Sequence, residues 1–358
     1  MPRLPWNGPS MRPLLILLAV LGSWVARAAW IDEWRARNPV WRGAHVLLHG
    51  PAMAREIESA LPALRATGLN VLVVEVDYGF AFDSHPEVRG GNALTREDAR
   101  RLAEACHAQG IRLIPQFSCL GHQSWAGTTH PLLAKHPEFD ETPGQYPGNK
   151  GIYCRSWCPR APGREAFVRD LLDEIIDGFG ADALHVGMDE VFVIGSEHCA
   201  RCRGVDAATL FADSVDELHA HVVGRRKLEM LMWSDRLLDA KTTGLGEWEA
   251  ARNGTAPAID RIPKDIVQCD WHYEPLAKYP GKPREYGSLR LLASKGFRVW
   301  PSSWKNVESA RAFATEARAL GDPRMLGLLV TTWGAVKPEG LAGWEPLRVG
   351  FDVWKGKP

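Results

Sequence analysis

The sequence predicts a single (β/α)8 barrel, and three observations support this fold class. Eight short runs of apolar or β-branched residues follow one another along the chain. Segments with helical periodicity separate most of these runs. A strand–helix alternation repeated eight times is the signature of the barrel, and 358 residues are enough to build one. No sequence repeat and no linker indicates a second domain.

The eight predicted strands are almost continuously apolar. That pattern is typical of a parallel sheet covered on its outer face by helices. In chain order, the predicted strands span residues 45–49, 70–77, 112–118, 183–190, 228–235, 265–271, 298–304 and 325–333.

Several of the connecting segments carry helix signals. Thr95 and Asp98 are spaced as in a capping box, and Gly110 follows as a stop. Asn306 is a candidate N-cap for the helix after the seventh strand. The fifth helix is poorly patterned, because residues 236–264 contain Gly and Pro.

The N-terminus predicts a signal peptide over residues 1–28, with Met11 as a second candidate start. Arg12 precedes an apolar run over residues 14–21, and the sequence Ala26-Arg-Ala28 matches a cleavage site. We therefore expect export to the periplasm or the extracellular space after cleavage near Ala28. The mature catalytic domain would span residues 29–358 without a membrane span. An uncleaved N-terminal anchor is the alternative.

Composition excludes some functions. The 43 basic and 43 acidic residues balance, and no basic stripe stands out, so we expect no nucleic-acid partner. The chain has 15 Trp against 6 Tyr. Such an excess of Trp suits a pocket that stacks on the apolar faces of sugar rings. No motif calls for a cofactor.

The central motif is a pair of carboxylates, Asp189 and Glu190, at the end of the fourth predicted strand. Burying such a pair is costly unless it serves a purpose. In a barrel, catalytic residues lie at the carboxyl ends of strands, so we interpret the pair as catalytic. Because strand side chains alternate between faces, we expect one carboxylate to act as an acid and the other as an orienting group. That arrangement argues against a carboxylate pair about 5 Å apart across the bond, and favours a nucleophile from the substrate.

Further polar and aromatic residues fall at or just beyond predicted strand ends. The candidate substrate contacts are His122, Asp77, Trp233, Asp235, Asp270, Trp271, Trp304 and Trp333, with Tyr273 as a third catalytic candidate. Plainer interpretations exist for several of them. Asp235 could cap the next helix, any one Trp could be a core filler, and His185 within the strand is expected to be a core histidine.

These motifs resemble glycoside hydrolase family 20, the β-N-acetylhexosaminidases. The resemblance is closest to its single-barrel, hexosaminidase D-like branch. It covers roughly residues 45–335 by order of motifs. It rests on His185-x-Gly187-x-Asp189-Glu190, Gly121-His122, Trp233 with Asp235, Trp333-Gly334, and Val73-Val-Glu75-Val-Asp77-Tyr78.

The resemblance implies an exo-acting β-N-acetylhexosaminidase that needs no cofactor and acts on N-acetylhexosamine-containing oligosaccharides or glycoconjugates. It implies that Asp189 orients the substrate's 2-acetamido group, and that Glu190 protonates the leaving oxygen and then activates water. Tyr273 would donate to the acetamido oxygen, with the Trp residues as pocket walls.

The sequence also departs from the family pattern. His49-Gly50 stands where the larger family has a sugar-gripping Arg, and Ala335 stands where it has a late carboxylate. These losses motivate an alternative, a catalytically inactive carbohydrate-binding barrel of the same fold.

Seven cysteines complete the candidates. Cys106, Cys119 and Cys269 are expected to be buried free thiols. Four others form two close pairs in polar loops: Cys154, Cys158, Cys199 and Cys202. For these four, disulfides, a zinc site and unpaired thiols all remain open, and no metal site is assigned.

Overall fold

The computed structural model describes residues 30–356. The chain divides into two units, residues 1–39 and 40–358. In the first unit, residues 30–37 form a helix. The predicted signal peptide, residues 1–28, lies outside the described residues. Among the described helices, none is long and apolar enough to cross a membrane.

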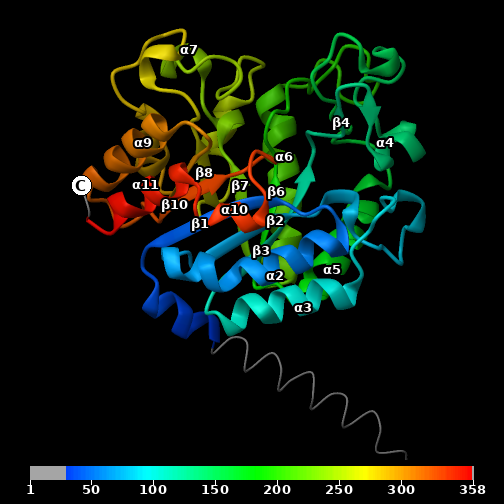
Figure 1. Cartoon of the computed structure of the whole chain (residues 1–358). Helices are drawn as coiled ribbons and strands as arrows, with labels where there is room; N and C mark the ends of the chain where they lie inside the picture. The colour runs from blue at the N-terminus through cyan, green and yellow to red at the C-terminus, as the bar shows by residue number, and fades with distance from the viewer. Residues whose placement is uncertain (1–29, 357–358) are drawn as a thin grey trace, which may run out of the picture. The chain divides into compact units, whose positions relative to one another are not determined.

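The second unit contains a closed barrel of eight parallel strands. Around the barrel, the strands follow the order β1-β10-β9-β8-β7-β6-β3-β2. They are β1 (Trp41–Leu47), β2 (Val71–Glu75), β3 (Arg112–Cys119), β6 (Ala183–Gly187), β7 (Glu229–Trp233), β8 (Val267–Trp271), β9 (Arg298–Ser303) and β10 (Gly327–Thr331). Each overlaps one predicted strand, so the predicted barrel is confirmed (Figure 1).

Helices cover the outside of the barrel (Figure 1). The longer ones are α2 (Gly50–Thr67), α3 (Arg96–Ala108), α5 (Arg164–Phe179), α6 (Ala207–His219), α8 (Gly287–Ser294), α9 (Val307–Ala319) and α11 (Glu345–Trp354). The capping box of Thr95 and Asp98 opens α3, and Asn306 caps α9 through the amide of Ser309. Both predicted caps are confirmed.

The alternation fails after β7, where the sequence pattern was poorest. That connection contains short pieces instead of one helix: η6 (Asp235–Leu237), α7 (Ala240–Thr243) and η7 (Ala256–Asp260). The other short elements are η1 (Asp77–Gly79), η2 (Pro86–Val88), η8 (Leu276–Lys278), α10 (Pro338–Leu341) and the π-helix η5 (Ala220–Arg225), which continues α6.

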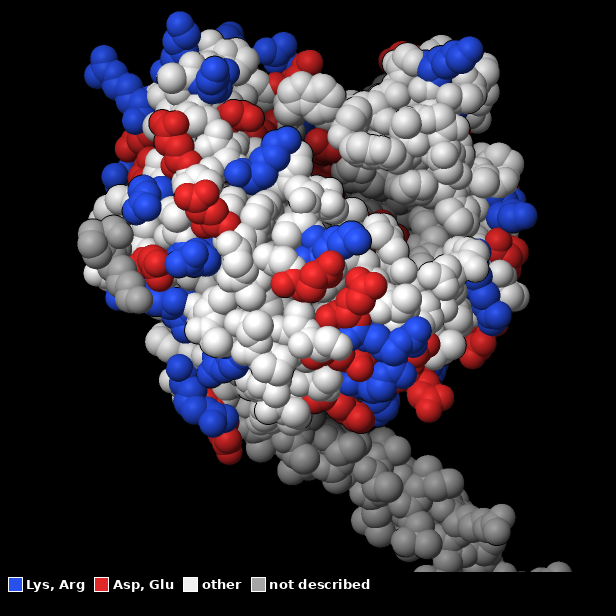
Figure 2. Space-filling model, in the orientation of Figure 1, with Lys and Arg blue, Asp and Glu red and all other residues white. Residues whose placement is uncertain are grey.

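The long connection after β3 is held together by the buried guanidinium group of Arg155. It contains β4 (Ser124–Trp125), β5 (Thr128–Thr129), α4 (Pro131–Lys135), η3 (Pro137–Phe139) and η4 (Pro147–Asn149). Arg155 donates to Asp140 at 2.6 Å and to Asn149 at 2.6 Å. Figure 1 shows this connection and the connection after β7, which contains α7, above the same end of the barrel. A hollow separates the two in the space-filling view (Figure 2).

The inside of the barrel holds polar and aromatic side chains. His45 on β1 and Trp233 on β7 are not on neighbouring strands, yet their rings lie 5.7 Å apart. Their side chains therefore meet across the barrel. His185 lies 4.5 Å from the same Trp233 ring and accepts a hydrogen bond from the Gly187 amide. Burial lowers the pKa of His185 to about 3, so it is a neutral core histidine, as expected.

Candidate active site

The backbone turns sharply where β6 ends. Gly187, Met188 and Glu190 all have positive φ angles, of 67°, 74° and 49°. Left-handed conformations at residues other than Gly are uncommon and cluster at functional sites. A Cβ at Gly187 would lie 2.9 Å from the Cα of Ser118, so only glycine lets β6 pass so close to β3. The strand stops at Gly187, two residues before the carboxylate pair.

This turn corrects the expectation that Asp189 and Glu190 point to opposite faces. Both carboxylates reach one atom, the Nε2 of His122, at 3.2 Å from Asp189 and 3.0 Å from Glu190. Strand alternation does not apply, because neither residue is in the strand. The pair therefore lies on one side, with His122 between its two members.

Charge holds this group of three together. Burial opposes a charge on His122, but attraction to Asp189 and hydrogen bonds to both carboxylates raise its pKa well above the usual value. Burial alone would raise the pKa of Asp189, yet the nearby His122 lowers it. Asp189 is therefore an anion beside an imidazolium.

Asp235 holds the backbone of the carboxylate pair in place. Its Oδ2 accepts hydrogen bonds from the amide of Glu190 at 2.9 Å and from Nε of Arg236 at 2.7 Å. Burial raises the pKa of Asp235 to about 6, although Arg236 opposes the rise. The side chain is fully covered, so it fixes the backbone of Glu190 and does not face a ligand. Neither the predicted sugar contact nor a helix cap describes it.

Two other predicted contacts are also buried in the structure. Trp233 fills the barrel interior, and Asp270 accepts a hydrogen bond from the hydroxyl of Ser234 at 2.9 Å. Both are fully covered because they lie within β7 and β8, below the open end. The sequence pattern placed both residues at strand ends, but it could not show whether each is the last buried residue of its strand or the first accessible one.

Tyr273 lies in an aromatic group built from three strand ends. Its hydroxyl accepts a hydrogen bond from Nε1 of Trp333 at 2.8 Å, and the Thr331 hydroxyl, which donates to the Ser303 carbonyl, lies 3.4 Å away. The rings of Trp271 and Trp304 lie 4.8 Å and 5.6 Å from the Tyr273 ring. Burial raises the pKa of Tyr273 well above its usual value, and the charge of Asp189 adds to the rise. These predicted site residues therefore lie together, within reach of the charge of Asp189.

Asp77 belongs to a second pair of carboxyl groups. Its Oδ1 accepts a hydrogen bond from the Ser118 amide at 2.7 Å. Burial and the neighbouring Glu75 raise its pKa to about 7. Burial and the charge of Asp189 raise the pKa of Glu75 to about 7 as well. Asp77 is partly accessible, so a ligand in the mouth could reach it.

Sequence reasoning missed an aromatic rim beside Glu190. The ring of Tyr153 lies 5.1 Å from that of Trp125 and 4.8 Å from that of Trp248. Trp125 and Trp248 are half exposed, at 52% and 51%. Tyr153 lies against Glu190, whose charge, after burial, raises the pKa of the tyrosine. These residues come from loops, where no helical or strand periodicity predicts which side chains meet. The only signal in the sequence is the presence of aromatic residues in Gly-rich loops.

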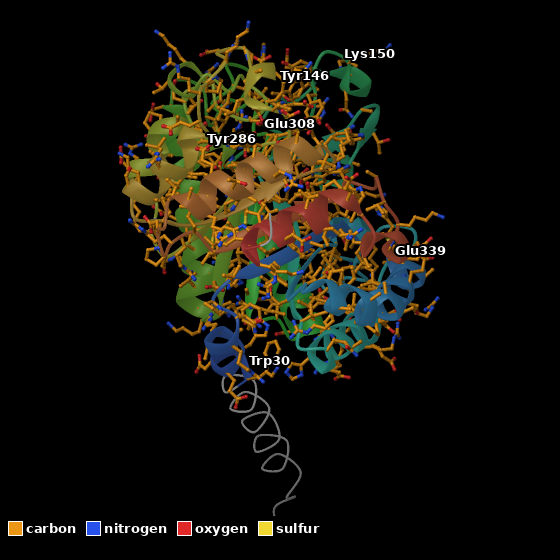
Figure 3. The ribbon with its side chains drawn as sticks, turned by 60° about the vertical axis from the view of Figure 1, so that its left-hand side comes forward. Trp30, Tyr146, Lys150, Tyr286, Glu308 and Glu339 are labelled. Carbon is orange, nitrogen blue, oxygen red and sulfur yellow. The ribbon has the colours of Figure 1, made fainter. Side chains whose placement is uncertain are left out.

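The rim borders a cleft of about 400 Å³. Its lining comes from the connection after β3, from residues just past Glu190 and from the connection after β7. Tyr146, labelled in Figure 3, lies on this lining. The cleft therefore opens between the two groups of loops that Figure 2 shows on either side of the hollow.

The four loop cysteines do not stay together. Cys158, Cys199 and Cys202 gather around Glu141, whereas the thiol of Cys154 donates to the backbone oxygen of Glu190 at 3.3 Å. The seven cysteines, all within the described residues, form no disulfide. Cys106, Cys119 and Cys269 are buried free thiols, as expected.

Comparisons with known proteins show which family the chain belongs to. Residues 59–337 match the family described as glycosyl hydrolase family 20, catalytic domain. Hexosaminidase D of Bos taurus is 23% identical over 282 residues, which are 76% of this chain and 72% of that protein. A β-hexosaminidase of Vibrio furnissii is 26% identical over 208 residues, which are 57% of this chain and 30% of that protein.

Solved structures share the fold. The chitobiase of Flavobacterium johnsoniae aligns with a TM-score of 0.63 at 18% identity, over 87% of this chain and 47% of that chain. The exo β-N-acetylglucosaminidase of Vibrio harveyi, solved in complex with N-acetylglucosamine, aligns with a TM-score of 0.57 at 15% identity, over 87% and 54%. The chain thus spans about half of these two structures and less than a third of the Vibrio furnissii protein. The family match covers most of its length, and the chain therefore belongs to glycosyl hydrolase family 20.

Proposed function

We propose that this protein is an exo-acting β-N-acetylhexosaminidase that uses the substrate's own acetamido group as nucleophile. The observation that carries the proposal is the shared side of Asp189 and Glu190, both within 3.2 Å of His122 Nε2, with Asp189 near enough to Tyr273 for its charge to raise the pKa of the tyrosine. One carboxylate can then face the acetamido group while its neighbour faces the leaving oxygen.

In the first step, the acetamido oxygen attacks C1 as the bond from C1 to the leaving oxygen breaks. Glu190 gives its proton to that oxygen. Asp189, held as an anion by His122, accepts the acetamido N–H and stabilises the positive charge of the oxazolinium ring. The indole N–H of Trp333 can only donate, so the Tyr273 hydroxyl accepts from it and keeps its own proton to donate to the acetamido oxygen.

In the second step, Glu190 takes a proton from water as the water oxygen attacks C1. The ring opens, the acetamide is regenerated, and the product keeps the starting configuration because C1 is inverted twice. The second carboxylate of an ordinary retaining pair is not needed.

The aromatic rim gives a place for the leaving group. Because Glu190 must face the leaving oxygen, the part of the substrate beyond that oxygen extends towards Tyr153, which contacts Glu190. Trp248 and Trp125 then offer half-exposed rings on which a second sugar stacks.

The test is Glu190→Gln assayed on two substrates that differ in their leaving group. An N-acetylglucosaminide with a poor leaving group should lose about 100- to 10,000-fold in kcat/KM, since general acid catalysis typically contributes that much. A dinitrophenyl N-acetylglucosaminide should lose less in its first step, because its leaving group needs no proton.

Glu339→Gln is the control. Glu339 is exposed on α10, away from the cleft residue Tyr146 in Figure 3, and its variant should match the wild type. Equal losses on both substrates, or no loss from Glu190→Gln, would remove Glu190 from the acid role.

A second candidate function is a sugar-binding barrel without catalysis. The observation that favours it is that His49, where the larger family has an arginine, is exposed at the N-cap of α2. Calorimetry with N-acetylglucosamine and N-acetylgalactosamine separates the two proposals. Binding by a folded sample that hydrolyses no aryl N-acetylhexosaminide would favour the binding barrel.

We also propose export, on the strength of the N-terminal sequence alone. Fractionation followed by N-terminal sequencing of the mature protein should find a start near residue 29. A protein that keeps residues 14–21 would instead be anchored or retained.

A further inference from the structure

A cluster of three thiols and one carboxylate lies apart from the proposed catalytic groups. Glu141 and Cys158 come from the connection after β3, and Cys199 and Cys202 come from the connection after β6. The four side chains are buried, and one ligand atom from each lies within 4.8 Å of all the others. The sulfur of Cys158 is 3.4 Å from that of Cys199 and 3.4 Å from that of Cys202.

These distances describe a pocket for an ion and not a disulfide. A disulfide joins two sulfurs at about 2.05 Å. Four ligands at about 2.3 Å from a tetrahedral metal have edges of about 3.8 Å. The two sulfur–sulfur distances of 3.4 Å lie much nearer the edge of a tetrahedral metal site than the length of a disulfide bond. Cys158 takes part in both distances, as expected when three thiols bind one ion.

Glu141 supplies independent support for a cation. Its Oε1 accepts a hydrogen bond from the Ser196 amide at 2.8 Å, whereas its buried Oε2 has no hydrogen-bond partner among the described residues. An unpartnered buried carboxylate oxygen is costly, and a metal ion would satisfy it.

The backbone around the cysteines is arranged to hold thiolates. The backbone amides of Arg160 and Arg201, each two residues after a cysteine, face the sulfurs of Cys158 and Cys199. The amides of Cys202 and Arg203 close a tight turn on the carbonyl of Cys199, at 3.2 Å and 2.9 Å. Amide donors of this kind orient and stabilise the ligands of metal sites.

We propose that Glu141, Cys158, Cys199 and Cys202 bind one structural zinc ion. Thiolates select zinc over magnesium and calcium, which prefer oxygen-only sets. Four protein ligands leave no open position, so the site is structural and not catalytic. The fourth ligand is Glu141, and Cys154 of the sequence-based set is replaced.

The ion would cross-link two loops that flank the proposed active site. Cys158 and Cys199 are 41 residues apart in sequence. Cys158 follows Tyr153 and Cys154, both of which contact Glu190, and Cys199 follows Phe192 on the cleft lining. Zinc would therefore hold the rim in place without touching substrate.

The test is elemental analysis of the full chain purified without chelator. We expect about one zinc per chain. After exchange for Co²⁺, we expect thiolate-to-cobalt charge transfer in the near ultraviolet and the visible bands of a tetrahedral site. Cys158→Ser should abolish both signals. Glu141→Gln should weaken zinc binding at least tenfold in competition with a chromophoric chelator.

Cys154→Ser and Cys106→Ser are the matched controls, since both remove a buried thiol outside the cluster, and each should keep one zinc. The proposal fails if the reduced wild-type chain, reloaded with zinc or Co²⁺, binds less than about a tenth of an equivalent. It also fails if mass mapping of the unreduced chain finds a disulfide between two of the three thiols. Loss of zinc in Cys154→Ser, or unchanged affinity in Glu141→Gln, would refute this ligand set. The wild-type measurements decide even if a variant does not fold.

Discussion

At the scale of single residues, Glu75 shows how the barrel interior shapes the charge of the site. Its Oε2 accepts hydrogen bonds from Gln116 at 2.7 Å and from His45 at 3.0 Å. Burial lowers the pKa of His45 to about 4, so at neutral pH this partner is neutral. Burial and the charge of Asp189 therefore decide the pKa of Glu75, which they raise to about 7.

We predict that Glu75→Gln changes the pH dependence of stability. The folded chain keeps a proton on Glu75 between about pH 4.5 and about pH 7, where the unfolded chain has released it. The free energy of unfolding of the wild type therefore falls as the pH rises through this window. Glutamine removes that loss and can still accept from Gln116 and His45.

Thermal or urea unfolding at pH 5 and pH 8 measures the effect. The free energy of unfolding of Glu75→Gln minus that of the wild type should be larger at pH 8 than at pH 5 by about 1–3 kcal/mol. Asp77 adds to the difference, because Glu75 raises its pKa, whereas groups away from Glu75 titrate alike in both proteins and cancel. Parallel stability curves for the two proteins would contradict the raised pKa.

The residues that the sequence revealed and those it hid differ in how they are placed. Asp189 and Glu190 were readable because a buried strand leads directly into them, and His122 was readable through its family motif. Tyr153 and Glu141 were hidden because each acts through contacts between two loops, which no spacing along the chain encodes. Asp235 was found, but its depth, and therefore its supporting role, needed the structure.

At the scale of elements, the end of β6 decides where the two carboxylates point. The pairing of β3 with β6 is irregular between Gln116 and Cys119, next to Gly187. That irregularity and the positive φ angles after it turn Asp189 and Glu190 to the same side. The eight strands were predictable from their apolar runs, whereas this turn was not, because it depends on how closely two strands approach.

We predict that Gly187→Ala is much more harmful than Gly110→Ala. Both glycines have a φ of +67°, so the intrinsic strain of a left-handed alanine, about 1–2 kcal/mol, is shared. A Cβ at Gly110 would meet nothing within 4 Å, whereas one at Gly187 would clash with the backbone of Ser118. Gly187→Ala should therefore cost more in unfolding free energy and lower kcat/KM at least tenfold.

Denaturant unfolding and an aryl N-acetylglucosaminide assay test this pair. Gly110→Ala, at the end of α3, should keep wild-type kcat/KM. Equal destabilisation by the two substitutions, with activity retained in both, would show that the close contact at Gly187 does not shape the site.

At the scale of the whole barrel, the ion pairs that stabilise the fold and the residues proposed to act on substrate lie at opposite ends of the strands. Arg112 at the start of β3 is fully buried and pairs with Asp182 at 2.8 Å and Glu229 at 2.7 Å. Arg298 at the start of β9 also pairs with Glu229, at 2.6 Å. These ion pairs lie at the amino ends of the strands, whereas the proposed active site lies at the carboxyl ends.

We predict that Arg112→Ala destabilises the fold by about 3–5 kcal/mol, because it removes the cation that pairs with Asp182 and leaves Glu229 with Arg298 alone. The kcat/KM of the folded fraction should stay within about threefold of the wild type. Arg298→Ala is the matched comparison, since Arg298 is 36% exposed and its loss should cost about 1 kcal/mol or less. A tenfold fall in the kcat/KM of folded Arg112→Ala would show that the two ends are coupled.

The most direct test of the account is a series of aryl N-acetylglucosaminides whose acetamido methyl group carries zero, one, two or three fluorine atoms. Fluorine withdraws electrons from the acetamido oxygen and makes it a poorer nucleophile, while the leaving group is unchanged. If that oxygen attacks C1 with the help of Asp189 and Tyr273, kcat/KM should fall steeply with each fluorine. A rate that does not depend on fluorine, or equal cleavage of the matching glucoside without the amide, would contradict the account.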